Sequence, residues 1–106
     1  MVNEIDSESL RQRLQHGEVL LLDIRTPGEI AEAAIPNALS MPMHLIPLRS
    51  GEIPKDRDVV LYCRSGARSY QACAYLVQQG YDRVLNLRGG IIAWARHGFP
   101  IERPAT

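Results

Sequence analysis

The chain has 106 residues, of which 45% are hydrophobic and 23% are charged, as is typical of one globular domain with a single core. Twelve acidic and twelve basic residues balance each other, which argues against the strongly basic surface of a nucleic-acid-binding protein. No apolar stretch approaches the roughly 20 residues of a membrane-spanning helix, and residues 1–9 carry no signal-peptide pattern. We therefore expect one cytoplasmic domain over residues 1–106, with neither membrane nor nucleic acid as a partner.

Apolar runs and helical patterns alternate along the chain. Asp6 or Ser7 is suited to cap the first helix, Pro27 stands near the first turn of the second, and Gly80 follows a later one. The continuous apolar runs LLLDI and VVLYC are typical of strands covered on both faces. In chain order, we expect a strand in residues 2–5, a helix in 6–17, a strand in 18–25, a helix in 26–34, a short strand in 35–42, a short helix or turn and a polar loop in 43–58, a strand in 59–63, a helix in 69–80, a strand in 82–87 and a helix in 89–98.

This alternation predicts an α/β domain with a mainly parallel sheet. Cys73 and Trp94 fall on the apolar faces of the last two long helical patterns, so we expect both side chains in the core. Cys63 differs from them, because it ends an apolar strand at the point where the chain turns into a helix. In open α/β sheets, ligand sites form at these carboxyl ends of the strands.

The segment CRSGARS, residues 63–69, has the composition of an anion-binding loop. Gly66 provides the freedom in φ that a tight curl requires, and such a curl directs successive backbone N–H groups inward. The start of the following helix adds partial positive charge, while Arg64 and Arg68 add formal charge. All these effects favour a thiolate, so we expect Cys63 to be a nucleophile with a lowered pKa. The alternative is a small buried cysteine in an ordinary strand–turn–helix connection.

Two kinds of anion chemistry compete for this loop. Cysteine phosphatases use a Cys-x5-Arg loop that encircles a tetrahedral dianion, whereas here Ser69 stands six residues after Cys63 and Arg68 five residues after it. The loop is therefore one residue short of the phosphatase pattern. A tighter loop suits a smaller group on the sulfur, such as one extra sulfur atom, and so favours a persulfide.

Four segments resemble the signatures of single-domain rhodaneses, a family of thiosulfate or persulfide sulfurtransferases, and the resemblance covers nearly the whole chain. They stand in the family's order and spacing: LLDIRTPGEI, IPNALSMP, VVLYCRSGARS and LNLRGGIIAWARHGFPI. The resemblance implies an open, mainly parallel sheet of about five strands flanked by helices on both faces. The chain departs from the family where Gly-His-Ile is usual, because Ala33 and Ala34 precede Ile35, and it lacks the aromatic residue usual near Ile30.

The resemblance also implies roles for individual residues. Cys63 corresponds to the nucleophile that accepts a sulfane sulfur, and Ser69 is placed to hydrogen-bond within the loop. Asp23 and Arg25 are expected to orient the loop from the end of the neighbouring strand. The backbone amides expected to cradle the persulfide, which together with Ser69 make the substrate-binding set, belong to Arg64, Ser65, Gly66, Ala67 and Arg68.

The implied reaction needs neither a metal nor an organic cofactor. A small anionic donor, for which the basic Arg64 favours thiosulfate, gives a sulfur atom to Cys63, and a thiol, cyanide or a sulfur-carrier protein accepts it. Two other interpretations stay open at this point. One is a catalytically weak interaction or persulfide-carrier module, and the other, disfavoured by the loop length, is a phosphatase or arsenate reductase.

Overall fold

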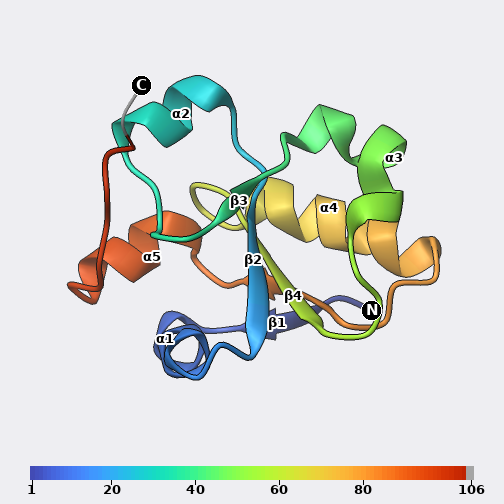
Figure 1. Cartoon of the computed structure of the whole chain (residues 1–106), viewed down its shortest axis with the longest axis horizontal. Coiled ribbons are helices and arrows are strands. Elements are labelled where there is room, and N and C mark those ends of the chain that lie inside the picture. Colours follow the sequence, from blue (N-terminus) through green and yellow to red (C-terminus); the bar gives the residue numbers. More distant parts are fainter. Residues whose placement is uncertain (105–106) are drawn as a thin grey trace.

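The computed structural model describes residues 1–104 and contains one parallel sheet between layers of helices (Figure 1). Its strand order is β1-β5-β4-β2-β3, which places β4, the strand before Cys63, in the middle. The strands are β1 (Asn3–Ile5), β2 (Val19–Asp23), β3 (Leu39–Ser40), β4 (Asp58–Tyr62) and β5 (Val84–Leu87). The helices are α1 (Ser7–Gln15), α2 (Pro27–Glu32), α3 (Ile46–Arg49), α4 (Ala67–Gln78) and α5 (Gly90–Arg96), with 3-10 turns η1 (Met43–Leu45) and η2 (Ser50–Glu52).

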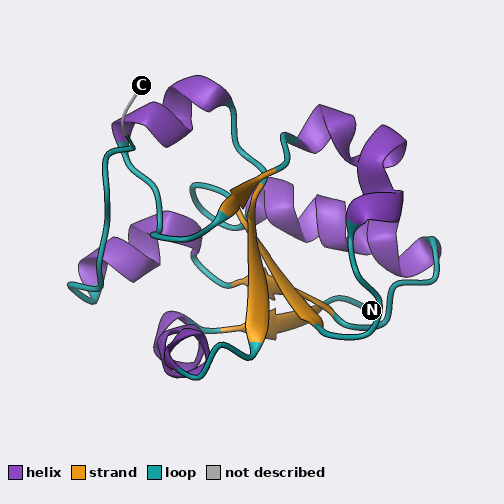
Figure 2. Cartoon of the chain, in the orientation of Figure 1, coloured by secondary structure: helices purple, strands orange, loops and turns teal. Residues whose placement is uncertain are grey.

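Helices cover both faces of the sheet (Figure 2). On one face, Val59 and Leu61 of β4 pack in a core with Cys73 and Leu76 of α4. On the other face, the alternate β4 residues Val60 and Tyr62 pack in a second core with α1 and α5. Because both faces are buried, the strand reads as a continuous apolar run. The predicted five-stranded α/β fold is confirmed.

The core predictions for two side chains hold, with Cys73 0% and Trp94 2% exposed. In residues 41–48 (MPMHLIPL), Met41 and Ile46 are buried in the core while Leu48 is exposed. The helix predicted from Ser69 begins earlier, at Ala67. Its N-cap is Gly66 with a φ of 100°, so the loop closes within fewer residues than the pattern suggested.

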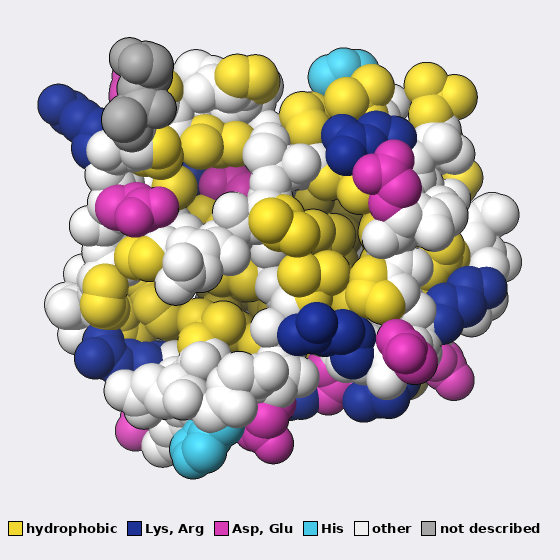
Figure 3. Space-filling model, viewed as in Figure 1, with side chains coloured by type: hydrophobic (Ala, Val, Ile, Leu, Met, Phe, Trp, Pro, Cys, Tyr) yellow, Lys and Arg dark blue, Asp and Glu magenta, His cyan; other side chains and the backbone are white. Residues whose placement is uncertain are grey.

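No helix within residues 1–104 has both the length and the apolar character required to cross a membrane. The space-filling view shows hydrophobic side chains gathered in a hollow beside α1 and α5 (Figure 3). A cavity of about 370 Å³ on this side is lined by Leu14, Val19, Ile35 and Trp94, among others, and Cys63 is not part of its lining.

The start of α5 packs directly on the backbone around Cys63. The amide of Ile91 donates to the carbonyl of Cys63 at 3.0 Å, and the amide of Ile92 donates to the carbonyl of Arg64 at 3.2 Å. Gly90 makes this approach possible, because a Cβ there would stand 2.5 Å from the Cys63 oxygen and 2.4 Å from the Arg64 oxygen. Its φ of 58° also lies in the left-handed region.

Replacing Gly90 with Ala should therefore destabilise the protein and move the loop at Cys63. We expect a loss of about 2–4 kcal/mol in the free energy of unfolding, since backbone overlap adds to the cost of a positive φ. Gly17→Ala is the matched control, because Gly17 has a φ of 68° but no atom within 4 Å of its added Cβ. It should lose about 1 kcal/mol. Equal losses in urea denaturation would contradict the close packing of α5 on the loop.

Candidate active site

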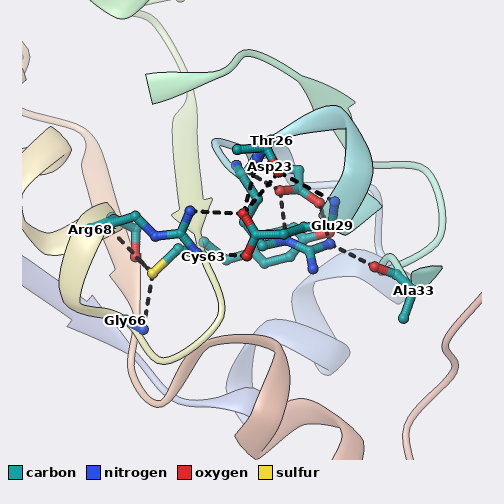
Figure 4. Close-up of polar contacts among 10 residues, drawn as sticks. Asp23, Thr26, Glu29, Ala33, Cys63, Gly66 and Arg68 are labelled. Carbon is teal, nitrogen blue, oxygen red and sulfur yellow. Dashed lines mark hydrogen bonds and ion pairs between the residues drawn. The ribbon is translucent and has the colours of Figure 1, made fainter. Parts of the chain in front are cut away.

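Cys63 lies directly after β4 and is 1% exposed. Three donors point at its sulfur: the amide of Gly66 at 3.1 Å, the amide of Ser69 at 3.5 Å and the Ser69 hydroxyl at 3.4 Å (Figure 4). Ser69 is 0% exposed and lies in the first turn of α4. The loop thus directs a short ring of hydrogen-bond donors at one sulfur atom, while the side chains of Arg64 and Ser65 stay exposed at its tip.

These donors change the acidity of the thiol. Burial alone would raise the pKa of Cys63, but the hydrogen bonds from the Ser69 hydroxyl and from the amides of Ser69 and Gly66 outweigh it and lower the pKa below its ordinary value. No such donor to Cys73 is found within residues 1–104, and burial raises its pKa to about 12. Of the two cysteines, Cys63 is therefore the one suited to react as a thiolate.

Asn86 of β5 holds the underside of the loop, and the sequence analysis did not identify it. This asparagine is 1% exposed, and its Oδ1 shares the single proton of the Ser69 hydroxyl with the Cys63 sulfur. Its Nδ2 donates to the Gly66 carbonyl at 3.2 Å and to Glu4 Oε2 at 2.9 Å. Its contacts fix both residues that donate to the sulfur. A signal for it existed in the sequence, because it is the one polar residue in the apolar run VLNL.

Arg68 is paired with a carboxylate that the sequence analysis also missed. Its two terminal nitrogens bind Glu29 of α2 at 2.9 and 2.8 Å. Glu29 is itself held by Thr26, since the two residues form a capping box at the start of α2. The hydrogen bonds from Arg68 lower the pKa of Glu29 to about 2. The spacing Thr-x-x-Glu signalled the capping box, but nothing in the sequence signalled the partner 39 residues away.

Asp23 and Arg25 lie beside the loop rather than against its donors. The Arg25 guanidinium binds Asp23 at 3.0 and 2.7 Å and the Ala33 carbonyl at 2.7 Å. The Tyr62 hydroxyl donates to Asp23 Oδ2 at 2.5 Å and accepts from the amide of Ile35 at 3.1 Å. Burial, together with its bond to Asp23, raises the pKa of Tyr62, so the phenol stays neutral. Asp23 is therefore linked, through the Tyr62 hydroxyl, to the residue that precedes Cys63.

The segment in which the family pattern is broken has its own support. Ala34 exchanges two backbone hydrogen bonds of 2.8 Å with Glu102, and the Ala33 carbonyl accepts from Arg25. Backbone contacts therefore hold this segment without the usual histidine. Within residues 1–104, no group of three or more His, Cys, Asp or Glu side chains is arranged to hold a metal ion.

Two cavities open beside Cys63. One of about 250 Å³ is lined by Arg25, Glu29, Arg64 and Ile91, among others. The other, of about 320 Å³, is lined by Arg25, His44 and Arg68, among others. Cys63 lines neither, which agrees with the burial of its sulfur. Two arginines line each cavity, Arg25 with Arg64 in the first and Arg25 with Arg68 in the second.

Comparison with known protein families matches residues 6–97 to the rhodanese-like domain. The chain belongs to this family. A protein of Allochromatium vinosum named sulfurtransferase is 79% identical over 105 residues, 98% of each chain. The protein YtwF of Bacillus subtilis is 39% identical over 94 residues, 88% of this chain and 90% of its own. The crystal structure of a rhodanese-like domain protein from Staphylococcus aureus aligns with a TM-score of 0.86 at 31% identity, covering 98% of this chain and 100% of that one.

In this rhodanese-like domain, the Ser69 hydroxyl should account for much of the acidity of Cys63. In a Cys73→Ala background, Ser69→Ala should raise the pKa of Cys63 toward the ordinary value of about 8.5, because the thiolate loses a donor. The ultraviolet absorbance of the thiolate, followed across pH, measures this shift. Ser7→Ala is the control, since Ser7 is also buried but its hydroxyl has no partner within the described residues. An unchanged titration in Ser69→Ala would contradict the role of this hydroxyl.

Proposed function

We propose that this chain is a sulfurtransferase that carries a sulfane sulfur on Cys63 as a persulfide. The observation that carries the proposal is the buried thiol of Cys63, with three donors from Gly66 and Ser69 within hydrogen-bonding distance of its sulfur. Such a site stabilises a sulfur anion with groups already in place before the reaction. The name of the relative with 79% identity supports the same reaction type.

The reaction has two steps, and thiosulfate is the donor we favour. The Cys63 thiolate attacks the outer sulfur of thiosulfate, a new S–S bond forms, the donor S–S bond breaks, and its electron pair leaves with sulfite. A thiol, as thiolate, or cyanide then attacks the outer sulfur of the persulfide, and the Cys63 thiolate is released. Splitting the transfer in this way is nucleophilic catalysis, with ping-pong kinetics as the expected pattern.

The loop residues divide the work in this proposal. The Gly66 and Ser69 donors hold the inner sulfur, while the amides of Ala67 and Arg68, which lie in the first turn of α4, extend the set toward the outer sulfur with those of Arg64 and Ser65. The exposed Arg64 side chain supplies the cation that favours an anionic donor. Exposure of the loop tip also suits a carrier protein or a small thiol as acceptor.

Asp23 and Arg25 are positioning residues in this proposal. Their ion pair holds the Tyr62 hydroxyl, and Tyr62 is bonded to Cys63 through the backbone. We infer that they fix the end of β4, and through it the position of the nucleophile.

Intact-protein mass spectrometry before and after thiosulfate tests the proposal. The native chain should gain about 32 Da, the mass of one sulfur atom, and cyanide should remove it because the persulfide is the covalent intermediate. Cys63→Ser should gain nothing and lose at least about a thousandfold in transfer rate. Cys73→Ala is the matched control, and it should gain the sulfur like the native chain because Cys73 lies in the core.

Three results would change the conclusion. A gain with polysulfide but not with thiosulfate would keep the Cys63 persulfide and replace the donor. A stable gain that no acceptor removes at a catalytic rate would favour a persulfide carrier. No gain with any donor would overturn the sulfurtransferase, and hydrolysis of an aryl phosphate would then favour the phosphatase.

A further inference from the structure

Two of the arginines beside Cys63 already bind carboxylates. Arg25 is 4% exposed and bound to Asp23, and Arg68 is bound through two nitrogens to Glu29. Arg64 is exposed and forms no ion pair within residues 1–104. An anionic donor therefore approaches a site in which the Arg68 charge is matched by a resident anion. The sequence analysis counted Arg68 as formal positive charge beside Cys63, and in the structure that charge is paired with Glu29.

The Arg68–Glu29 pair lies between the two cavities beside the thiol. Glu29 lines the cavity that contains Arg64, and Arg68 lines the cavity that contains His44. The pair joins α2 to the first turn of α4 near Cys63 (Figure 4). The pair also interacts electrostatically with the nucleophile. Glu29, and to a smaller extent the Cys63 thiolate, raises the pKa of the Arg68 guanidinium. A donor that enters through either cavity therefore meets one member of the pair.

The Glu29 carboxylate is held by several hydrogen bonds at once. Its carboxylate receives two nitrogens of Arg68 and also the amide and hydroxyl of Thr26. Arg–carboxylate pairs of this two-point kind are stronger than single contacts and fix geometry. The geometry imitates the one in which two oxygens of a sulfonate would bind Arg68. Glu29 therefore already fills the two-point contact that Arg68 could offer to an anion.

We propose that Glu29 is a specificity-determining residue: by holding Arg68, its carboxylate weakens the binding of doubly charged donors more than that of singly charged ones. This inference rests on the proposed sulfurtransferase function and adds a selection of donors by charge. Glu29 repels each negative charge on the donor. Because it already binds Arg68, it also weakens the attraction between Arg68 and that charge. The loss of binding free energy that Glu29 causes should be about twice as large for thiosulfate, a dianion, as for a monoanion such as methanethiosulfonate.

Both donors transfer sulfur by the same balanced step. The Cys63 thiolate attacks the outer sulfur, the donor S–S bond breaks, and its electron pair leaves with sulfite from thiosulfate or with methanesulfinate from methanethiosulfonate. The nucleophile and the transferred atom are the same, so a difference between the two donors reports their charge and shape. Comparing the same pair of donors across variants then isolates the charge.

Glu29→Gln is the decisive variant, because glutamine keeps the shape and can still form the capping box with Thr26. We expect KM for thiosulfate to fall about tenfold and KM for methanethiosulfonate to fall about threefold, with kcat nearly unchanged. Lower ionic strength should enlarge both effects. In an Arg68→Gln background the gain from Glu29→Gln should shrink, because the two residues act as a pair.

Glu52→Gln is the matched control for the change in net charge. Glu52 also binds an arginine through two contacts, to Arg49 at 2.9 and 2.9 Å, and lies outside both cavities. It should leave both KM values unchanged. A purely structural role of Glu29 would instead lower thermal stability and change both donors by the same factor, which would overturn the inference.

Thiosulfate binding to the unreactive Cys63→Ser variant, measured by calorimetry, separates this inference from the proposed function. Tighter binding of about tenfold in Cys63→Ser/Glu29→Gln supports the role of Glu29 without any turnover. Equal binding in the two variants overturns it, even if the native chain transfers sulfur normally. If binding tightens but the native chain accepts no sulfur from either donor, the proposed function fails while the competition of Glu29 for Arg68 stands.

Discussion

The opposition between burial and hydrogen bonding at the sulfur of Cys63 governs this site. A thiol that is 1% exposed would ordinarily resist ionisation, because its thiolate loses the solvation of water. Donors from Gly66 and Ser69 replace that solvation, and the pKa falls below the ordinary value. A site that removes water and supplies fixed dipoles stabilises a sulfur anion more effectively than water does, since the dipoles need no reorganisation.

The surrounding structure serves mainly to keep those donors in place. Below the loop, Asn86 binds both Ser69 and the Gly66 carbonyl. Beside the loop, the first amides of α5 donate to the carbonyls of Cys63 and Arg64. The two backbones can come this close only because residue 90 is a glycine. Two strands, β4 and β5, and two helices, α4 and α5, thus meet at one turn of the chain. A rigid scaffold of this kind holds in place a loop that consists largely of small residues.

Apart from the exposed Arg64, the arginines near the thiol are paired with carboxylates. Asp23 neutralises Arg25 in the interior and receives the Tyr62 hydroxyl, while Glu29 neutralises Arg68 closer to solvent. Only a paired charge is tolerated at low exposure, because an isolated one loses its hydration without compensation. In the proposed function, this pairing leaves the backbone dipoles and Arg64 as the main attraction for an anionic donor. The inference about Glu29 follows from this arrangement.

The sequence by itself determined the sheet and predicted which cysteine is the reactive one. Buried parallel strands must be apolar on both faces, so LLLDI and VVLYC identified the central strands, and a cysteine followed by small and basic residues at a strand end identified the loop. It also carried the family signatures. The tertiary structure alone decided which side chains meet: Asn86 beneath Ser69, and Glu29 on Arg68 across 39 residues. Such contacts depend on how strands and helices pack, and no local periodicity or cap encodes the distance between two elements far apart in the chain.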